Sequence, residues 1–427
     1  MSKYPSDWLS KPLGKVYPKI VVGYVGNVND HYCRAEEGVP FYRTLNIRDG
    51  YFRHSEHLYV THEFNEKNKK SQITNNDILI ARVGANLGMV CKANGISGLA
   101  NMANAIIIKT KDVNSADADF YTYFLLSPMG KNQIYSGAAG GAQGVFNTKL
   151  TQEIIVPVPP LPEQRKIAKI LSTWDKAIAT TERLIATSQQ QKKALMQQLL
   201  TGKKRLVNPD TGMVFEGDWE DVNLSSLAKS GKKNFTDGDW IESPYITDSG
   251  CRLIQTGNIG IGCFKDKNKK YISSDSFDEL GCTEVLPGDL LICRLAEPAG
   301  RACVVPDLNE DRLLTSVDVT IMKVDNKKSS ALFLSYYFSL DHTLYTISAL
   351  CGGSTRSRVS RTNLAKMKIL LPPLTEQRKI TAVLTAADKE IELLETKLAR
   401  LKDEKKALMQ QLLTGKRRVK IDDAEAA

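Results

Sequence analysis

Two long segments of the chain carry apolar side chains in alternating steps of four and three residues. A repeat of this kind places the apolar side chains on one face of an α-helix, as in a coiled coil. Seven of ten such positions are apolar in the first segment, and nine of ten in the second. They are Ile167, Leu171, Trp174, Ile178, Thr181, Ile185, Ser188, Lys192, Leu195 and Leu199, then Ile380, Leu384, Ala387, Ile391, Leu394, Leu398, Leu401, Lys405, Leu408 and Leu412. The pattern predicts two helices of about 40 residues, or about 60 Å at 1.5 Å per residue.

Each predicted helix begins after a double proline and ends at a glycine. Pro159–Pro160 and Pro372–Pro373 stop the preceding strand, because proline lacks the N–H that a strand or helix interior needs. Gly202 and Gly415 predict the helix C-termini. A helix packed only on its own domain is the alternative. A rod of about 60 Å is too long for a domain of about 160 residues, whose radius of gyration is near 15 Å, so we expect the helices to pair.

Shorter apolar runs outside the helices predict strands. They are Ile78–Val83, Ala105–Ile108 and Ile154–Val158 before the first helix, and Leu290–Leu295, Val317–Val324 and Met367–Leu371 before the second. The aromatic-rich runs Phe120–Leu126 and Leu332–Phe338 predict short helices. Each part of the chain that precedes a long helix is therefore expected to be a mixed α/β domain.

The whole chain is an internal repeat. PPLPEQRKI at Pro159–Ile167 returns as PPLTEQRKI at Pro372–Ile380, and 372 − 159 = 213. KKALMQQLLTGK at Lys192–Lys203 returns unchanged at Lys405–Lys416, and 405 − 192 = 213. Fainter upstream matches keep nearly the same offset: FYRTLNI (Phe41–Ile47) with LIQTGNI (Leu253–Ile259), and NNDILIARVG (Asn75–Gly84) with PGDLLICRLA (Pro287–Ala296). Two duplicated units, each a divergent domain followed by a near-constant helix, account for this pattern.

The order of the parts predicts how the helices pair. The second domain lies between the end of the first helix and the start of the second, so an antiparallel pair with one domain at each end is the simplest arrangement. The predicted fold class is α+β: two mixed α/β domains separated by two long antiparallel coiled-coil helices, with an internal pseudo-twofold repeat. The predicted boundaries are 1–158 for the first domain, 159–205 for the first helix, 206–371 for the second domain, 372–417 for the second helix and 418–427 for a polar tail.

The net charge indicates the kind of binding partner, and the cysteine pattern indicates the cellular compartment. The net charge is +10, which favours a polyanionic partner, with nucleic acid first and an anionic membrane surface second. No apolar run approaches the roughly 18 residues of a membrane span, and the polar N-terminal segment does not resemble an export signal. The eight cysteines form no CxxC pair. We therefore expect a cytoplasmic protein with reduced thiols.

The two PPL-x-EQRKI stretches, the two KKALMQQLLTGK stretches and the alternation of variable and constant parts resemble the specificity subunit of type I restriction–modification systems. The resemblance implies that each variable part is a target recognition domain for one half of a split double-stranded DNA site. It implies that the helices set the spacing and bind two modification (methyltransferase) subunits, which carry S-adenosylmethionine and methylate adenine. Two restriction (motor/nuclease) subunits, which use ATP and Mg²⁺, would complete the assembly. The chain itself would bind no cofactor and have no catalytic residues.

Arginine, lysine and glutamine side chains in the variable parts are the candidates for DNA contact. Arg and Gln make bidentate contacts to guanine and adenine, whereas Lys mostly meets phosphate. The richest segments are Ile47–His57, Glu66–Lys70 and Phe264–Tyr271. The predicted DNA-binding residues are Arg43, Arg48, Arg53, Arg82, Gln255, Lys265, Arg294, Arg301, Arg356, Arg358 and Arg361, the last three because arginines clustered in a loop suit phosphate contact.

The near-constant stretches are the candidates for partner contact. Twelve identical residues exceed what helix packing requires, because cores tolerate conservative exchanges. The predicted partner-binding residues are Glu163, Gln164, Arg165, Met196 and Gln197, with their repeats Glu376, Gln377, Arg378, Met409 and Gln410.

Motifs of catalysis and metal binding are weak in this sequence. Neither double proline belongs to an Asn/Asp-Pro-Pro-Tyr/Phe motif, and the glycine-rich Ser136–Gly144 lacks a GxGxxG or GK[ST] spacing. That segment is expected to be either a flexible loop or a clamp on the DNA backbone. Glu404–Lys406 matches a nuclease motif by letter only, and His54, His57 and His62 lack a cysteine pair, so no metal site is expected. A standalone DNA-modifying enzyme and a coiled-coil scaffold without a DNA role remain the alternatives.

Overall fold

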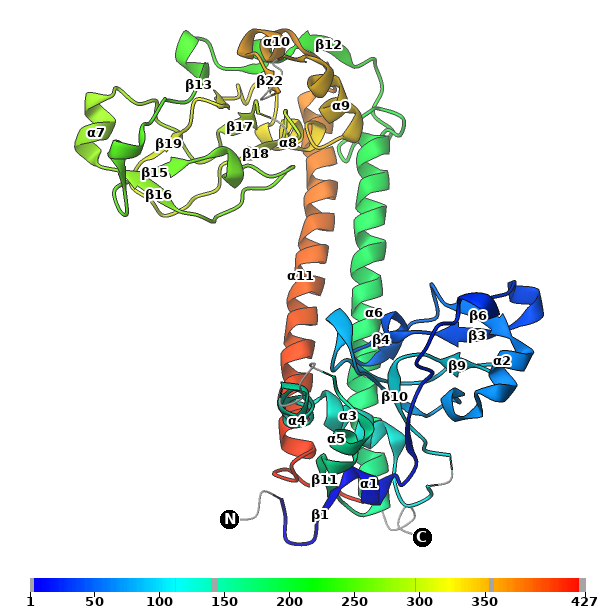
Figure 1. Cartoon of the computed structure of the whole chain (residues 1–427). Coiled ribbons are helices and arrows are strands. Elements are labelled where there is room, and N and C mark those ends of the chain that lie inside the picture. Colours follow the sequence, from blue (N-terminus) through cyan, green and yellow to red (C-terminus); the bar gives the residue numbers. More distant parts are fainter. Residues whose placement is uncertain (1–3, 112, 140–144, 296, 353–356, 422–427) are drawn as a thin grey trace. The chain divides into compact units, whose positions relative to one another are not determined.

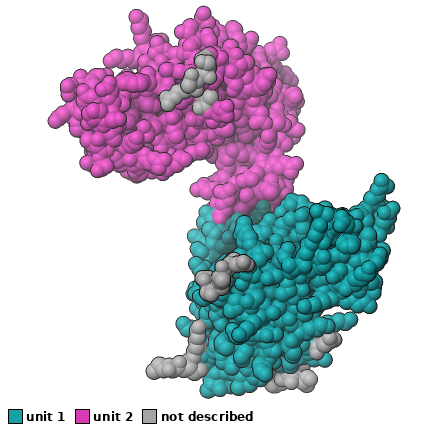
Figure 2. Space-filling model, in the orientation of Figure 1, with its two compact units in different colours: residues 1–182, 396–427 teal, residues 183–395 magenta. Residues whose placement is uncertain are grey.

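The computed structural model of the chain describes residues 4–111, 113–139, 145–295, 297–352 and 357–421. It divides into two compact units, one of residues 1–182 with 396–427 and one of residues 183–395 (Figure 2). Each unit thus holds one globular part and a portion of each long helix. We call them unit 1 and unit 2.

Both long helices are present. α6 spans Leu161–Leu199 and α11 spans Leu374–Leu412, 39 residues each (Figure 1). Every apolar-face position predicted above is buried or half-buried. Gly202 and Gly415 follow the helices with φ of 70° and 68°, a left-handed conformation that glycine adopts without strain at a helix C-terminus.

The helices pair antiparallel within unit 1. Leu171 of α6 lies in the same core as Leu412 and Leu413 of α11. Further along α6, Asp175 forms an ion pair with Lys405, and Glu182 forms one with Lys402 at 2.8 Å. Residue numbers rise along α6 as they fall along α11, which defines the antiparallel direction.

Unit 2 has the same pairing. Leu199 of α6 shares a core with Ile380 and Leu384 of α11, and Lys192 forms an ion pair with Asp388. The residue numbers of this pair give 192 + 388 = 580, and those of the Asp175–Lys405 pair in unit 1 give 175 + 405 = 580. The helices therefore pair in the same register in both units.

The globular part of unit 1 is built on two sheets. The larger has the order β2-β10-β7-β8, all antiparallel, and the smaller has the order β6-β3-β9. Their bounds are Ile20–Val22 (β2), Gly38–Tyr42 (β3), Leu58–Thr61 (β6), Ile78–Ala81 (β7), Val90–Lys92 (β8), Asn101–Met102 (β9) and Ala105–Ile108 (β10). Short elements complete it: β1 (Leu9–Pro12) paired with β11 (Ile155–Val158), β4 (Ile47–Arg48) paired with β5 (Tyr51–Phe52), α1 (Leu13–Val16), α2 (His62–Lys67), α3 (Ala118–Leu126), α4 (Pro128–Ala139) and α5 (Thr148–Glu153).

Alternate residues of β7 enter two different cores. Ile78 and Ile80 pack with Phe120 of α3 and the long helices, whereas Leu79 and Ala81 pack on the opposite face. Side chains of a strand point to alternate faces, so a strand covered on both sides is apolar throughout. The larger sheet therefore packs against the helices with one face and against the smaller sheet with the other.

Unit 2 repeats this plan. Its larger sheet has the order β13-β20-β17-β18, and its smaller sheet has the order β14-β16-β15-β19. The bounds are Phe235–Asp237 (β13), Ile246–Thr247 (β14), Cys251–Ile254 (β15), Lys270–Ile272 (β16), Leu290–Cys293 (β17), Ala302–Val304 (β18), Leu313–Thr315 (β19) and Val319–Met322 (β20). The other elements are β12 (Glu220–Asn223) paired with β23 (Lys368–Leu371), β21 (Cys351–Gly352) paired with β22 (Arg358–Val359), α7 (Ser274–Glu279), α8 (Ala331–Tyr337), α9 (Asp341–Ala349) and α10 (Arg361–Lys366).

Several local predictions from the sequence differ from the structure. The strand predicted at Ile78–Val83 ends at Ala81, where the main-chain oxygen of Arg82 accepts a hydrogen bond from Phe146 N at 3.1 Å instead of continuing the ladder. The strands predicted at Leu290–Leu295 and Val317–Val324 are also shorter, Leu290–Cys293 and Val319–Met322. The predicted loop Ser136–Gly144 begins as helix, since α4 continues to Ala139. The remainder of that segment lies outside the described residues.

Candidate nucleic-acid interface

A buried asparagine holds a hairpin in unit 1. Asn46 is 0% exposed. Its Oδ1 accepts a hydrogen bond from Arg43 N at 2.8 Å, and its Nδ2 donates to Arg53 O at 2.9 Å and Ser55 O at 2.8 Å. The hairpin that this amide closes consists of β4 and β5, with Ile47 paired to Phe52. The acceptor of the amide fixes a main-chain N–H three residues earlier, and its donor fixes main-chain carbonyls seven and nine residues later.

Asn258 makes the same bonds in unit 2. It is 2% exposed. Its Oδ1 accepts from Gln255 N at 2.9 Å, and its Nδ2 donates to Lys265 O at 2.9 Å and Lys267 O at 2.7 Å. Ile259 bridges Phe264 across the hairpin. The matched FYRTLNI and LIQTGNI stretches thus contain a shared loop anchor, and the role of its asparagine is visible only in the structure.

Three of the four predicted DNA-binding arginines of unit 1, namely Arg43, Arg48 and Arg53, lie on or beside this hairpin. Arg53 donates from Nε to Ser55 Oγ at 2.8 Å and forms an ion pair with Glu56. Arg43 Nη2 reaches Glu56 O at 3.3 Å, and Arg48 Nη1 donates to Asn86 Oδ1 at 2.8 Å. Arg82, half-buried after β7, stands apart from this group on the chain.

The predicted residues of unit 2 divide by exposure. Lys265 is exposed on the hairpin, and Gln255 lies half-buried at its base. Arg301 is half-buried, and its guanidinium donates to four main-chain carbonyls, those of Ile259, Thr256, Leu295 and Pro298, at 2.9–3.1 Å. Arg301 therefore supports the hairpin, and four of its five N–H donors are occupied by the fold rather than open to a base.

Three further arginines gather around two aspartates in unit 2. Arg294 and Arg361 lie 3.0 and 3.8 Å from Asp237, and Arg358 lies 3.2 Å from Asp318. Arg294 is only 4% exposed, and burial lowers its pKa, while Asp237 opposes that effect. The exposed member is Arg361, and Arg356 lies outside the described residues. The predicted arginine loop differs from the structure, because Arg358 lies on β22 and Arg361 begins α10. Arg294 forms the buried base of the cluster.

Glu163 and Glu376, predicted to bind a partner, are buried. Arg418 donates to Glu163 at 2.7 and 2.8 Å, and Trp8 Nε1 donates to the same carboxylate at 3.1 Å. In unit 2 Arg205 and Trp219 take these places around Glu376 (Nε and Nη2 of Arg205 at 2.7 Å, Nε1 of Trp219 at 3.1 Å). Arg418, predicted to belong to a polar tail, is thus part of unit 1.

The neighbouring glutamines are also buried and bonded within their own units. Gln164 Oε1 accepts from Asp117 N at 2.9 Å, and Gln377 Oε1 accepts from Ser330 N at 3.0 Å. Each side chain fixes the start of α3 or α8 to the first turn of a long helix. Since burial closes the four Glu and Gln side chains to a partner's surface, we remove them from the proposed docking residues.

The other predicted partner-binding residues keep some exposure. Arg165, Gln197, Arg378 and Gln410 are exposed on the long helices. Met196 and Met409 are half-buried, each packed against the core of its own unit. The surface left for a partner is therefore polar and basic, with the methionines at its edge.

A tyrosine, an aspartate and a lysine join each globular part to both helices. In unit 1 Tyr123 OH donates to Asp175 Oδ2 at 2.6 Å, and Lys405, which pairs with Asp175, lies 5.4 Å from the Tyr123 ring centroid. Unit 2 repeats this with Tyr336, Asp388 and Lys192, again at 2.6 and 5.4 Å. Lys192 and Lys405 interrupt the apolar face of the predicted coiled coil. A lysine at the same apolar-face position of both helices is the feature of the sequence that could have indicated these contacts.

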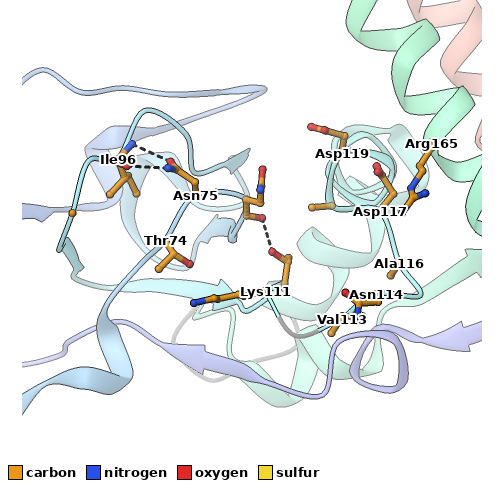
Figure 3. Close-up of a pocket in the computed structure, with 14 residues that line it drawn as sticks. Thr74, Asn75, Ile96, Lys111, Val113, Asn114, Ala116, Asp117, Asp119 and Arg165 are labelled. Carbon is orange, nitrogen blue, oxygen red and sulfur yellow. Dashed lines mark hydrogen bonds between the residues drawn. The ribbon is translucent and has the colours of Figure 1, made fainter.

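Unit 1 also has a hollow of about 760 Å³ between the turn at Thr74–Asn76 and the start of α3. Figure 3 shows Asn75 and Thr74 on one side and Asp117, Asp119 and Arg165 on the other. Asp117 accepts from Phe120 N at 2.9 Å, and Asp119 forms an ion pair with Lys92 at 2.6 Å. These acids stabilise the first turn of α3, which is a structural role.

His54 and His57, which were considered as metal ligands, contact tyrosine side chains of the smaller sheet. His54 Nδ1 lies 3.2 Å from Tyr42 OH, and His57 Nε2 lies 3.0 Å from Tyr59 OH. Among the residues that the structure describes, no three His, Cys, Asp or Glu side chains come together as a metal site. No helix within the described ranges is long and apolar enough to cross a membrane.

Comparison with known proteins gives a consistent result. Residues 5–187 and 216–403 each match the family described as the type I restriction modification DNA specificity domain. Two specificity subunits of Methanocaldococcus jannaschii, of the type I restriction enzymes MjaVIII and (putatively so described) MjaX, are each 26% identical; the matches cover 89% and 98% of this chain and 86% and 96% of those proteins. The crystal structure of the HsdS subunit from Thermoanaerobacter tengcongensis aligns with a TM-score of 0.52 at 18% identity, over 96% of this chain and 98% of that one, and so shares its fold.

Proposed function

The chain belongs to the type I restriction modification DNA specificity family, and from this premise we propose that each of its two globular parts reads one half of a bipartite DNA site. The observation that carries the proposal is the repeated architecture. The two units share the strand order of the larger sheet, the helix register and the loop anchors, yet differ in the side chains that these frameworks expose. Two different reading surfaces on one scaffold suit an asymmetric, two-part target.

Charge supports DNA as the target. The chain carries 58 Lys and Arg against 48 Asp and Glu. Phosphate contacts by Lys and Arg supply most of the sequence-independent affinity for DNA, and contacts to base edges supply specificity. Among the candidates from the sequence, Lys265 and Arg361 are exposed and Arg53 is half-buried, and they lie on the hairpins and in the arginine cluster.

The long helices set the distance between the half-sites in this proposal. Each has 39 residues, or about 58 Å at 1.5 Å per residue. The lysine–aspartate pairs fix the register of the helices in each unit, so the helices can slip only by breaking these pairs. A spacer of fixed length requires such a register.

We further propose that the helix surfaces bind two modification (methyltransferase) subunits, and that two restriction subunits join through them. The repeated KKALMQQLLTGK stretches offer two equal surfaces, with Gln197 and Gln410 exposed on them. In this arrangement S-adenosylmethionine, ATP and Mg²⁺ belong to the partner subunits, and the chain contributes recognition rather than catalysis.

An exchange of domains tests the proposal. Residues 1–158 are replaced by the corresponding part of another family member, with α6 and everything after it retained. The chimera, assembled with its modification subunit, is expected to methylate sites in which only one half has changed. A change in both halves, or in neither, would overturn the assignment of one half-site to each globular part.

A further inference from the structure

We propose that the hairpins at residues 47–55 and 259–267 are the base-reading elements of the two units, and that Asn46 and Asn258 are the positioning residues that hold them in the reading conformation. This inference rests on the proposed function, because it names the element within each unit that contacts the bases of its half-site.

The first argument is that the side-chain amides of Asn46 and Asn258 are fully hydrogen-bonded. We call each asparagine with its hydrogen bonds the clamp of its hairpin. Asn46 and Asn258 are 0% and 2% exposed, and each amide accepts one main-chain N–H and donates to two main-chain carbonyls. The main-chain oxygen of each asparagine also accepts from Arg53 N or Lys265 N, at 2.8 and 2.7 Å. A buried amide with all these partners is costly to replace, since each carbonyl left without a donor loses a hydrogen bond. The hairpin is therefore held in one conformation before any ligand arrives.

The second argument is that the clamp is constant while the loop it presents is not. In both units Nδ2 reaches the carbonyls seven and nine residues later. The hairpins share Asn, Ile, Gly and Phe at the same spacing, in NIRDGYFRHS (46–55) and NIGIGCFKDK (258–267), and differ at every other position. A constant frame that presents different side chains is the arrangement expected of a recognition loop on a rigid scaffold.

The third argument is exposure. The shared Ile47, Phe52 and Ile259 are buried in the cores beneath the hairpins. Most of the differing positions face solvent, and they include Tyr51 at 57% exposed and Ile261 at 47%. Gly260 is buried, and Arg48 and Arg53 are half-buried. Large side chains on rigid, exposed loops contribute contact area without a large loss of conformational entropy on binding.

Additional contacts fix each hairpin to its sheet. In unit 1 Asp49 Oδ1 accepts from Val90 N at 2.9 Å. In unit 2 Arg252, which is 0% exposed, donates to Asp266 at 2.9 Å, and Arg301 donates to Ile259 O at 2.9 Å. These contacts place the hairpins with the rigidity that specific recognition needs.

The chemistry of the two tips differs in a way that suits two different half-sites. A two-stranded ribbon fits the major groove, where each base pair presents its own pattern of donors, acceptors and methyl groups. Unit 1 offers Tyr51, Arg53 and His54, which are hydrogen-bonding and planar. Unit 2 offers Lys265 and Lys267 for guanine or phosphate and the apolar Ile261 for a thymine methyl group.

An exchange of tip residues is the first test. Ile261→Asp, Cys263→Tyr, Lys265→Arg and Lys267→Ser together place the residue types of Asp49, Tyr51, Arg53 and Ser55 at the equivalent positions of the second hairpin. Asn258, Ile259, Gly262 and Phe264 stay, and Asp266 stays because it pairs with Arg252. The full chain, assembled with its modification subunit, selects binding sites from a DNA library in which both half-sites are randomised.

The exchange is expected to change the second half of the selected site, or to reduce its preference over scrambled sequence at least tenfold, and to leave the first half unchanged. Glu279→Ala, at the exposed end of α7 in the same unit, is the matched control and should select the original site. An unchanged second half in the exchanged chain overturns the proposal.

Substitution of the clamp is the second test. Asn258→Asp keeps the acceptor oxygen but puts an oxygen where Nδ2 donates to two carbonyls. The expected result is at least a tenfold loss of preference for the correct second half, with binding to scrambled DNA changed less than about twofold. Asn46→Asp should do the same to the first half only. Equal loss at both halves in either variant would indicate a general effect on folding and would overturn the positioning role.

Cys263, exposed at the tip of the second hairpin, provides a test without substitution. Maleimide should modify Cys263 at least tenfold more slowly when the chain is bound to DNA with the correct second half than when it is bound to DNA with that half scrambled. Equal rates would contradict the proposal. If the unaltered chain selects no bipartite site, the proposed function fails; if it selects one that the hairpin variants leave unchanged, only this inference fails.

Discussion

Arg205 donates from Nε and Nη2 to the two carboxylate oxygens of Glu376, both at 2.7 Å. Arg205 follows the C-terminus of α6, and Glu376 lies in the first turn of α11, so this pair ties the end of one long helix to the start of the other within unit 2. The Glu376 side chain is 0% exposed. The negative charge of this buried carboxylate is therefore stabilised by Arg205 and by the hydrogen bond from the indole N–H of Trp219.

Loss of Arg205 is expected to destabilise unit 2 strongly. Removing one partner of a buried ion pair leaves the other charge uncompensated, which typically costs about 3–5 kcal/mol. Because Arg205 is partly exposed, we expect Arg205→Ala to cost about 3 kcal/mol, measured by urea-induced unfolding followed by tryptophan fluorescence. The corresponding variant of unit 1, Arg418→Ala, should act in the same direction.

An exposed pair in the same unit is the control. Lys193 and Asp341 lie 2.8 Å apart with side chains 64% and 72% exposed. Lys193→Ala should change the free energy of unfolding by less than about 1 kcal/mol, since solvent screens such pairs. Equal effects of Arg205→Ala and Lys193→Ala would mean that the buried pair is not a determinant of stability.

Shortening both helices by seven residues tests their role as the spacer. The sum of 580 in both units matches Arg183–Gln189 with Ile391–Lys397, so deleting both segments preserves the helix register and the apolar face. The rod loses about 10 Å, or about three base pairs at 3.4 Å per step, and the half-sites rotate by roughly 100°. We expect methylation at the original spacer to be lost. Unchanged methylation there would show that the helices do not set the distance.

Charge at the repeated helix surface should block assembly one partner at a time. Gln197→Arg alone is expected to leave one modification subunit per chain, and Gln197→Arg with Gln410→Arg to leave none, by light scattering. Both side chains are exposed, so the fold should be unaffected. Gln190→Arg, exposed on α6 outside the repeated stretch, is the control. Two bound partners in the double variant would place the docking surface elsewhere.

Thiol reactivity should follow burial. Burial raises the pKa of Cys91 and of Cys303 to about 12, so about one molecule in 10⁴ carries either thiolate at pH 8. Cys263 is exposed and should react first with maleimide, while the two buried thiols react only after unfolding. Mass spectrometry of partly labelled protein measures this order, and early labelling of Cys91 would contradict it.

The raised pKa values of Cys91 and Cys303 also predict that the folded protein loses stability at alkaline pH. Above about pH 9 the thiols ionise in the unfolded chain but stay protonated in the folded one, so unfolding releases protons and the free energy of unfolding falls as pH rises toward 12. Cys91→Ala with Cys303→Ala should flatten this decline, as measured by urea unfolding at pH 8 and pH 10. An identical decline in the double variant would assign it to other groups.

Periodicity in the sequence was sufficient to predict the two long helices and the internal repeat. An apolar residue every three or four positions has one low-energy arrangement over 40 residues, and Gly202 and Gly415 end it because of their backbone freedom. The strands were located but drawn too long where a tertiary hydrogen bond, such as Phe146 N to Arg82 O, diverts the chain.

Side-chain roles near the candidate sites were decided by tertiary structure. Glu163 and Arg301 look like surface charges in the sequence, yet one is closed in by Arg418 and Trp8 and the other donates to four carbonyls. Whether a charge is buried depends on residues hundreds of positions away, because the partner of Glu163 is 255 residues distant.

The sequence by itself determined the duplication, the presence of the two long helices and the family resemblance, because these depend on residue identity and spacing along one chain. Only the tertiary structure decided which charges are buried and which are exposed, and showed that Asn46 and Asn258 anchor equivalent hairpins. That anchor consists of hydrogen bonds to main-chain carbonyls, which every residue possesses. Its partners therefore leave no signature in the sequence, and only their positions in space identify them.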